Sequence, residues 1–298
     1  MKDIDVVLKN QFKLFFSSAS SDVPNSDVET FINSISFNSS YKIKDFSNLD
    51  KMSKLNSDIY NYNIRRYFRD FNKDIINTNK TFYLILFSES FEYQFFQLLT
   101  KTFPSAPFYH YTSLDALIKI LNSNKIRFSS IASLNDRGEL YYFDNIFDAQ
   151  INNLKLNKQN LNVLKNSNLT YENDIISKFH YKTIESFNNR FLLSCSSLKD
   201  KLDQWRLYGD DGKGVCIELN GLEGSISDKN PLFDDFYIGR ILYGDSFVKS
   251  FFKLQYNLLV NDNIYLSFNN LNIWKHFFKS DDWEGEKEIR IFNELISK

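Results

Sequence analysis

Phe108-Tyr109-His110-Tyr111-Thr112-Ser113-Leu114 is the stretch of sequence around which the rest of the chain can be organised. Aromatic and β-branched residues favour a strand, and a hydroxyl side chain directly before a leucine-rich run is typical of a helix N-terminus. The stretch therefore predicts a short strand that carries His110, followed by a helix capped by Thr112 or Ser113. A histidine placed beside hydroxyl groups and the start of a helix can hold a polar ligand.

The chain that follows alternates between short strands and helices. In the first helix, apolar residues recur at three- and four-residue steps (Leu114, Leu117, Ile118 and Leu121), and asparagines at 122–124 end it. The same patterns predict strands at 125–130, 190–196, 214–219, 236–243 and 287–292, and helices at 138–151, 171–189, 199–208 and 247–276. Residues 152–168 are rich in Asn and Lys and predict a surface loop.

The residues before this stretch have a different character. Residues 1–103 are predicted to be mainly helical, with Asp27 as a helix cap, an aromatic repeat at 57–71 and a buried helix over 81–99. Two prolines within residues 104–107 then disfavour helix and suit an extended connector. We therefore predict two domains, 1–103 and 104–298.

Composition and charge exclude several classes of protein. The chain of 298 residues carries 36 basic and 37 acidic side chains, so no global field draws it to nucleic acid or to an anionic membrane. Cys195 and Cys216 lie within apolar runs, so we expect them to be small buried residues rather than a disulfide or a metal-binding pair. This pattern suits a reducing cytoplasm. No run of about 18 apolar residues occurs, so we expect a cytoplasmic protein without a membrane span.

Familiar catalytic motifs are missing from the sequence. The three histidines are scattered without metal-ligand spacing, and neither a phosphate-binding loop, a dinucleotide fingerprint nor a nucleophile elbow is present. Four polar clusters associated with predicted strands remain: His110-Tyr111-Thr112-Ser113, Ser129-Ser130 with 135–139, Ser194-Cys195-Ser196 with Trp205 and Tyr208, and 283–290.

The order of these clusters resembles a bacterial family of domains of unknown function. Its hallmarks are an H-Y-T/S strand, a serine-rich second strand followed by N-D-P-x-E, a W-x-x-Y helix before a G-V-C strand, and a late E-x-E-x-R strand. The resemblance covers residues 108–292, with Arg137 at the position where the family has proline. That family resembles, in turn, the ADP-ribosyltransferase superfamily, in which a split, mainly antiparallel sheet holds NAD in a cleft.

The resemblance implies an α+β fold: a split, mainly antiparallel ADP-ribosyltransferase-like sheet with flanking helices, preceded by the mostly helical N-terminal region. It implies NAD as the substrate and no metal. The catalytic residues it implies are His110, Tyr208, Glu286 and Glu288. The NAD-binding residues it implies are His110, Tyr111, Thr112, Arg127, Ser129, Ser194, Ser196, Trp205 and Arg290.

The chemistry of the late strand suits this assignment. Breaking the bond between nicotinamide and ribose builds positive charge on the sugar, which a nearby carboxylate stabilises. Side chains two residues apart lie on the same face of a strand, so Glu286, Glu288 and Arg290 are predicted to share one face. Arg290 would then orient the carboxylates or bind a phosphate, and His110 would donate a hydrogen bond to a ribose hydroxyl.

Each of these residues also has a purely structural interpretation. His110 alone would suit the interior, and residues 286–290 would form an ion-pair ladder at a sheet edge. Trp205, Tyr208 and Trp283 would be core residues, and the Ser194 and Ser196 hydroxyls would reflect strand pairing. Asp136 would form a turn, and Glu139 would cap or pair locally.

Three function classes therefore remain open. The first is an ADP-ribosyltransferase, as a bacterial toxin or anti-phage effector that modifies protein or nucleic acid, with residues 1–103 contacting a regulatory partner. The second is a module that senses a nucleotide or nucleic acid without turning it over. The third is a metal-dependent, nuclease-like effector that uses Asp136, Glu139, Glu286 and Glu288.

Overall fold

The structure is a computed structural model that describes residues 3–19, 23–35, 42–45, 83–86, 89–100, 107–134, 138–153, 190–220, 236–262, 264–268 and 271–294. The described chain divides into two compact units that interleave along the sequence. The first unit takes its described residues from Met1–Leu99, Asp144–Lys178 and Asp245–Lys275, and the second from Thr100–Phe143, Phe179–Gly244 and His276–Lys298. The division into domains 1–103 and 104–298 stays a prediction.

The second unit holds the stretch with His110. Its strands are β3 (Phe108–Thr112), β4 (Ser129–Ser130), β5 (Arg190–Ser196), β6 (Val215–Leu219), β7 (Phe236–Arg240), β8 (Leu242–Tyr243), β10 (Phe278–Lys279) and β11 (Glu288–Glu294). Its helices are α5 (Leu114–Ser123), the start of α6 (Gly138–Asn153), α10 (Leu202–Leu207) and the short 3-10 turns Ile131–Ser133, Asp210–Gly212, Lys275–Phe277 and Asp281–Glu286.

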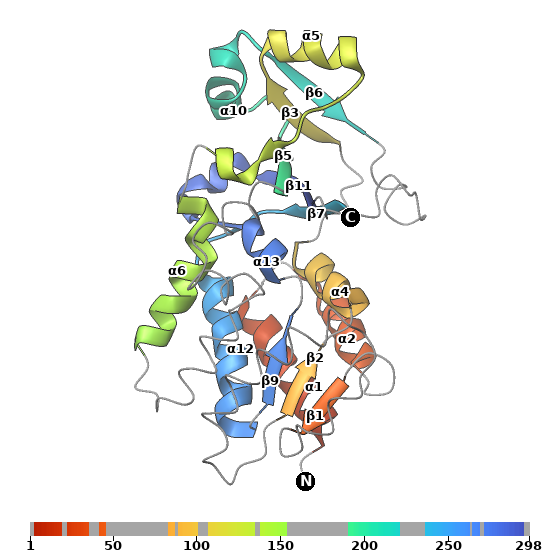
Figure 1. Ribbon diagram of the computed structural model, residues 1–298, viewed down its shortest axis with the longest axis vertical. Coiled ribbons are helices and arrows are strands. Elements are labelled where there is room, and N and C mark those ends of the chain that lie inside the picture. The colour runs from red at the N-terminus through yellow and green to blue at the C-terminus, as the bar shows by residue number, and fades with distance from the viewer. Residues whose placement is uncertain are drawn as a thin grey trace. The chain divides into compact units, whose positions relative to one another are not determined.

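Six of these strands form one antiparallel sheet in the order β6-β3-β5-β11-β7, with β4 paired to the side of β5 (Figure 1). β11 lies inside the sheet, because Ile291 is opposite Leu193 of β5 on one side and Ile238 of β7 on the other. β8 and β10 form a separate, parallel pair. The prediction of an α+β fold with a mainly antiparallel sheet is therefore confirmed.

One face of this sheet carries an apolar core. Ile289 and Ile291 of β11 pack there with Leu193, Ile238 and Phe108, and burying a side chain of this size contributes about 1.5–3 kcal/mol. Alternation along the strand directs Glu288 and Arg290 to the opposite face. The alternation of charged and apolar residues over 287–292 predicts a half-exposed strand, but Glu288 and Arg290 are 5% and 2% exposed, so this prediction is wrong. The interpretation of 286–290 as an ion-pair ladder at a sheet edge is also wrong, because β11 lies between β5 and β7.

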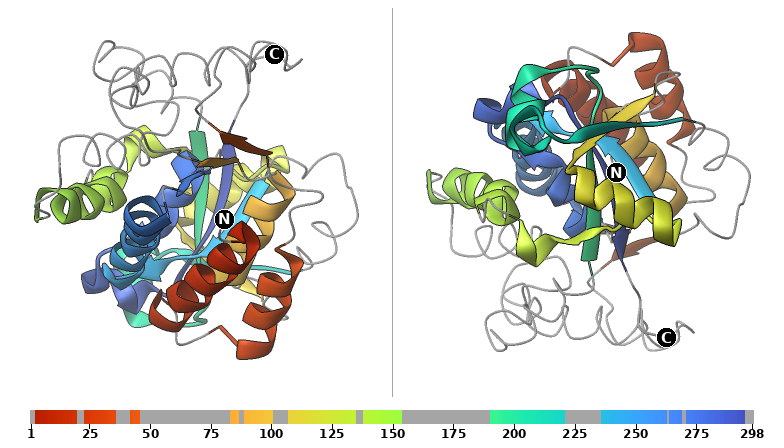
Figure 2. Two further views of the ribbon diagram at one scale, coloured as in Figure 1. Left: turned by 90° about the horizontal axis from the view of Figure 1, so that it is seen from below. Right: turned by 90° about the horizontal axis from the view of Figure 1, so that it is seen from above.

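The sheet opens along one edge of β5. β3 meets β5 at the pair Tyr109 and Ser196 alone, while β4 pairs with Leu192 and Phe191. β3 continues instead along β6, with His110 opposite Ile217. The views in Figures 1 and 2 show β3 and β6 turning away from β5 and β11. Residues 193–195 of β5 therefore border an opening in the sheet.

Helix α5 follows β3 as the sequence predicts. The Ser113 hydroxyl accepts a hydrogen bond from the backbone N–H of Ala116 at 3.2 Å, and Asn124 ends the helix in the left-handed region. None of the α5 side chains is buried, however. The apolar repeat that would usually pack on a core is instead largely exposed, with Leu114, Ile118 and Leu121 at the surface.

The first unit is built on aromatic packing. Its elements are α1 (Ile4–Ala19), α2 (Asn25–Ser34), β1 (Lys42–Asp45), β2 (Tyr83–Leu86), α4 (Glu89–Thr100), α12 (Ser246–Asp262), β9 (Ile264–Ser267) and α13 (Leu271–Trp274). α1 packs beside α2 and against α12 (Figure 2). The Phe95 ring lies 5.7 Å from that of Phe12 and 5.4 Å from Trp274, distances at which aromatic pairs stabilise a core.

Several predictions for this unit are wrong. Residues 83–86 form the central strand of the three-stranded sheet β1-β2-β9 rather than part of a helix, and 264–267 form its third strand. Both segments are short apolar runs, for which periodicity does not separate strand from helix. Asp27 lies in the first turn of α2, while Pro24 is at the cap position.

Other predictions fall on residues outside the described ranges. These are the aromatic repeat at 57–71, the turn that contains Asp136 and Arg137, the loop beyond residue 153 and the helix 171–189. Within the described ranges, no helix combines the length and apolarity needed to cross a membrane.

Candidate functional site

A cavity of about 770 Å³ lies at the opening of the six-stranded sheet, within the second unit. Its walls come from β3, α5, the segment 125–134, β5, α10 and the residues just before and at the start of β11. The predicted site residues among its lining are His110, Tyr111, Thr112, Arg127, Ser129, Ser194, Tyr208, Glu286 and Glu288. The fold thus brings together residues separated by up to about 180 positions.

Residues of α5 complete the cavity wall. Ala116, Lys119, Ile120 and Ser123 line it at helical spacing, which means that one face of α5 borders the cavity along its whole length. The opposite face exposes Leu114, Ile118 and Leu121 to solvent.

His110 projects from β3 toward β5. Its Nδ1 lies 2.9 Å from the carbonyl oxygen of Ser194, and because a carbonyl only accepts, Nδ1 carries the hydrogen. Burial lowers the pKa of His110, and the bond to Ser194 opposes this shift only in part. The ring is therefore neutral at pH 7 and offers Nε2 as an acceptor. His110 can therefore accept a hydrogen bond at this atom, the reverse of the direction that the sequence suggested.

Glu288 and Arg290 form a bidentate ion pair on the face of β11 opposite the core. Arg290 donates from Nε to one Glu288 oxygen at 2.7 Å and from Nη2 to the other at 3.1 Å. Its remaining bonds go to the His276 carbonyl and to Glu139, each at 2.6 Å. Arg290 is thus enclosed by protein and has no surface for a phosphate, so its role is to orient carboxylates.

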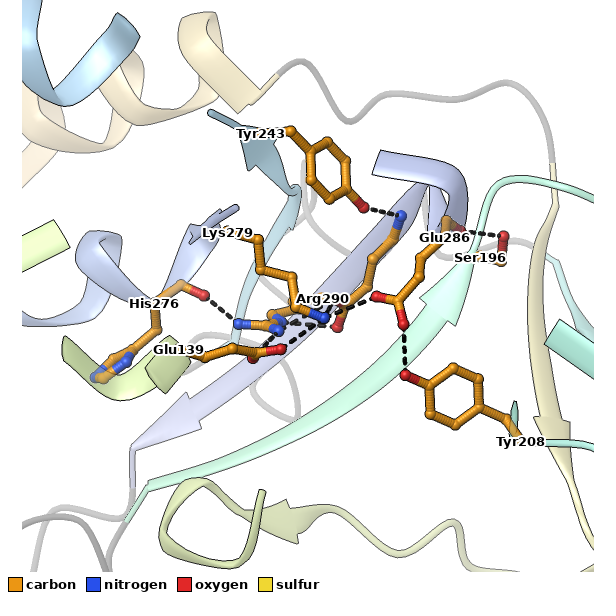
Figure 3. Close-up of polar contacts among 9 residues, drawn as sticks. Glu139, Ser196, Tyr208, Tyr243, His276, Lys279, Glu286 and Arg290 are labelled. Carbon is orange, nitrogen blue, oxygen red and sulfur yellow. Dashed lines mark hydrogen bonds and ion pairs between the residues drawn. The ribbon is translucent and has the colours of Figure 1, made fainter. Parts of the chain in front are cut away.

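Lys279 of β10 lies among three carboxylates (Figure 3). Its ammonium is 2.6 Å from Glu139, 2.7 Å from Glu286 and 3.1 Å from Glu288. Burial would lower the pKa of Lys279, but Glu288 and Glu139 outweigh burial and raise it. Three carboxylates face two cations, Lys279 and Arg290, so the cluster keeps one net negative charge. We call these five residues the carboxylate cluster.

The position of Lys279 bears on metal binding. The ammonium occupies the point where Glu139, Glu286 and Glu288 converge, which is where a divalent ion would need to lie. No group of three or more His, Cys, Asp or Glu side chains within the described ranges is arranged to hold a metal ion. Asp136, the fourth residue of the metal-dependent hypothesis, lies outside those ranges.

Glu286 reaches the cavity from a turn rather than from the strand. It ends the 3-10 helix Asp281–Glu286, and Lys287 then adopts a left-handed φ of 44° before β11 begins at Glu288. The prediction that Glu286 and Glu288 share one strand face is therefore wrong, although Lys279 still joins their carboxylates. The Ser196 hydroxyl fixes this turn by donating to the Glu286 carbonyl at 2.8 Å.

Two tyrosines form hydrogen bonds with glutamates of the carboxylate cluster. The Tyr208 hydroxyl donates to Glu286 at 2.5 Å, and the Tyr243 hydroxyl accepts from the backbone N–H of Glu288 at 2.8 Å (Figure 3). Burial and the bond to Glu286 raise the pKa of Tyr208. Tyr208 therefore stays protonated at pH 7 and holds the Glu286 carboxylate at the cavity wall.

Three of the predicted binding residues do not line the cavity. Ser196 is 1% exposed and holds the Glu286 turn. Trp205 packs edge-on against Tyr111 at 5.1 Å and donates from its indole N–H to Asp200 at 2.8 Å, so its ring does not face a ligand. Arg290 lies within the carboxylate cluster.

The cavity wall formed by α5 and the segment that follows it is basic. Lys119 of α5 and Lys125 and Arg127 of the following segment line it, together with the hydroxyl groups of Ser123, Ser129 and Ser133. Lys119 also pairs with Asp115 at 2.6 Å. The segment after α5 leads into β4, which pairs with Phe191 and Leu192 of β5, whereas Glu288 is opposite Ser196 at the other end of β5. The cavity thus has an acidic end and a basic end.

Some residues of the site were not predicted. Glu139 was expected to pair locally but bonds to Arg290, 151 residues away, because the Phe143 ring packs 5.3 Å from Phe278 and brings α6 to β10. Lys279 follows the apolar Phe277-Phe278 pair, and a lysine at the end of such a run is the one signal that could have indicated a buried cation.

Acid should weaken the fold through Glu288. Burial would raise the pKa of this carboxyl, but Arg290 and Lys279 outweigh burial and lower the pKa from 4.5 to about 2. A carboxyl with a lower pKa in the folded chain stabilises the fold when ionised. This stabilisation, about 3 kcal/mol, is complete above pH 4.5 and is lost as the pH falls toward 2. When the free energy of unfolding is measured in urea between pH 6 and pH 3, it should fall less steeply for Glu288→Gln than for the wild type. An equally steep fall in both proteins would contradict this.

The fold and the site define the class of this protein: an α+β protein whose antiparallel sheet opens onto a cavity bordered by a carboxylate cluster. Residues 204–291 match the family described as "Protein of unknown function (DUF2971)". The match is shorter than the resemblance expected over 108–292, and it contains Tyr208, Lys279, Glu286, Glu288 and Arg290 but not His110. No curated protein and no solved structure matches the chain significantly.

Proposed function

We propose that the chain is an NAD-dependent ADP-ribosyltransferase with an ADP-ribosyltransferase-like fold, and that its cavity holds NAD. One observation carries this proposal. His110 of β3, Ser194 of β5 and Glu288 of β11 come from three neighbouring strands and line one cavity where the sheet opens. The resemblance at the sequence level implies a split sheet with His110 in the first position, Tyr208 or the Ser194 and Ser196 pair in the middle one, and Glu286 or Glu288 in the last.

The acidic end suits the chemistry of the reaction. When the bond from the ribose to nicotinamide breaks, positive charge develops on the sugar, and nicotinamide leaves with the bonding electron pair. The carboxylate cluster keeps one net negative charge, and its Glu286 and Glu288 line the cavity. Fixed carboxylates in a site screened from water stabilise such charge without having to reorganise. Glu288, with a pKa of about 2, is ionised at neutral pH.

The basic end suits the pyrophosphate of NAD. Lys125 and Arg127 line the cavity on the side away from the carboxylates, and the hydroxyl of Ser129, which lines the same wall, can donate to a phosphate oxygen. A ligand with an anionic middle and a cationic reacting end would match both ends of the cavity. NAD has this distribution of charge.

Replacing Arg127 tests the basic end. Arg127→Gln should weaken NAD binding about tenfold, because one charge-assisted hydrogen bond to the pyrophosphate is lost. The difference in NAD affinity between the wild type and Arg127→Gln should become smaller as the salt concentration is raised, because Arg127 is exposed and salt screens its charge. Arg206→Gln removes the same charge from an exposed position of α10 that does not line the cavity, and it should leave affinity unchanged. Equal affinities for the two variants in isothermal titration would contradict this assignment.

A second candidate function is a module that binds a nucleotide without turning it over. Both oxygens of Glu288 are already engaged by Arg290 and Lys279, an arrangement that also serves a purely structural carboxylate. In that case the cavity would bind NAD or a related nucleotide without cleaving it.

Label transfer distinguishes the two candidates. The full chain is incubated with NAD labelled on the adenylate, together with bacterial protein, DNA and RNA, and both label transfer and nicotinamide release are measured. The proposal predicts nicotinamide release and transfer to one class of acceptor. NAD binding without either product would support the non-catalytic module and would contradict the transferase.

A further inference from the structure

Gln204 of α10 carries a buried amide without a partner. Gln204 is one of the residues that line the cavity and is 5% exposed; its Nε2 is buried and has no hydrogen-bond partner among the described residues. The Gln204 carbonyl, by contrast, accepts from the N–H groups of Tyr208 at 2.9 Å and Gly209 at 3.1 Å.

A buried donor without an acceptor costs folding free energy, so native proteins rarely retain one without a reason. The neighbouring polar groups of this wall are satisfied: Tyr208 donates to Glu286, and Glu286 also accepts from Lys279. Gln204 differs from them in having no acceptor among the described residues. A ligand in the cavity can supply one when the amide turns toward it.

The position of Gln204 indicates which part of the ligand it meets. Tyr208 directly follows α10 and its backbone N–H donates to the Gln204 carbonyl, so the two residues are neighbours; both line the cavity, and the Tyr208 hydroxyl donates to Glu286. Gln204 therefore lies at the acidic end, where the proposed reaction separates ribose from nicotinamide. Nicotinamide carries a carboxamide, whose oxygen is a strong acceptor.

We infer that Gln204 is a specificity-determining residue, and that its side-chain amide donates a hydrogen bond to the carboxamide oxygen of the nicotinamide group. This inference rests on the proposed function, because it takes NAD as the ligand. The contact selects ligands that present a carbonyl oxygen at the leaving group and holds that group against the carboxylate end of the cavity.

The test compares two ligands in isothermal titration of the full chain: NAD, and ADP-ribose, which lacks nicotinamide. Gln204→Met keeps the length of the side chain and removes the amide. It should weaken NAD binding about tenfold and leave ADP-ribose binding unchanged. Its melting temperature should not fall, because the substitution removes an unsatisfied donor rather than a hydrogen bond of the fold.

Gln255→Met is the matched control. Gln255 is also a buried helical glutamine, but it belongs to the other unit and its amide donates to the Leu266 carbonyl at 3.2 Å. This variant should lose stability and keep wild-type affinity for both ligands. The pair separates an effect on recognition from the general effect of replacing a buried glutamine.

The outcomes are distinguishable. Equal affinity of wild type and Gln204→Met for NAD, or an equal loss toward NAD and ADP-ribose, overturns the inference and leaves the proposed function standing if nicotinamide is released. A melting temperature that falls together with affinity assigns Gln204 a structural role and also overturns it. Selective loss of NAD binding without any turnover by the wild type supports the inference and contradicts the transferase. A wild type that does not bind NAD overturns both.

Discussion

Replacing Arg290 by methionine is expected to lower the free energy of unfolding by about 3–5 kcal/mol, the usual cost of removing one partner from a buried ion pair. Arg290 is 2% exposed and bonds to Glu288, Glu139 and the His276 carbonyl. Without it, the buried carboxylates of Glu286 and Glu288 and the largely buried carboxylate of Glu139 would share Lys279 alone. The chain would then have to protonate a carboxyl or admit water, and both cost free energy.

Urea unfolding followed by tryptophan fluorescence and by circular dichroism measures this loss. Arg206→Met is the control, because Arg206 is exposed on α10 and its replacement should change stability by no more than about 0.5 kcal/mol. The loss of unfolding free energy in Arg290→Met should also become smaller at acidic pH, because the remaining carboxyls of the cluster then take up protons. A loss below about 1 kcal/mol for Arg290→Met would contradict the buried ion-pair geometry.

Glu288→Gln is expected to reduce turnover of NAD by about 100- to 1000-fold, the range found when a group that stabilises transition-state charge is removed. The amide keeps the size of the side chain and an oxygen that can accept from Arg290, but it carries no charge to stabilise the ribose. NAD affinity should change much less than turnover, since the charge matters mainly in the transition state.

Glu218→Gln provides the control for this substitution. Glu218 lies on β6 of the same sheet, but it is exposed, pairs with Lys199 at 3.5 Å and does not line the cavity. Its variant should keep wild-type turnover. Both variants are assayed at neutral pH after circular dichroism has shown them to be folded. Unchanged turnover in Glu288→Gln would exclude a catalytic role and favour the non-catalytic module.

Local pattern predicted much of the second unit. The apolar run of β5 and the repeat in α5 with its Ser113 cap were read correctly, because continuous strands and capped amphipathic helices leave strong local signals. Short apolar segments were less predictable. Residues 83–86 and 264–267 became neighbouring strands β2 and β9, and nothing in either segment indicates a partner about 180 residues away.

The alternation along β11 was predicted, but its burial was not. Charged residues at every second position are typical of a strand with one solvated face, so Glu288 and Arg290 suggested exposure. The structure buries that face beneath β10 and the start of α6, where Lys279 and Glu139 compensate the charges. Such compensation depends on tertiary contacts and leaves no periodic signal in the sequence.

The candidate site was predicted as a set of residues rather than as a network. His110, Ser194 and Glu288 were each among the residues that the family resemblance implies, and the sheet order places them on one cavity. The direction of the His110 hydrogen bond followed only from its contact with the Ser194 carbonyl. Gln204 belongs to no motif, and its distinguishing feature is a buried Nε2 with no hydrogen-bond partner among the described residues.

A crystal structure of the Glu288→Gln variant with NAD tests the central claim most directly, because the variant should bind NAD without consuming it. The account predicts NAD in the cavity of the six-stranded sheet, with the nicotinamide-linked ribose beside Glu286 and residue 288, and with the pyrophosphate near Lys125 and Arg127. A ribose hydroxyl should lie within hydrogen-bond distance of His110 Nε2. NAD bound elsewhere on the chain, or a cavity left empty at saturating NAD, would contradict the account.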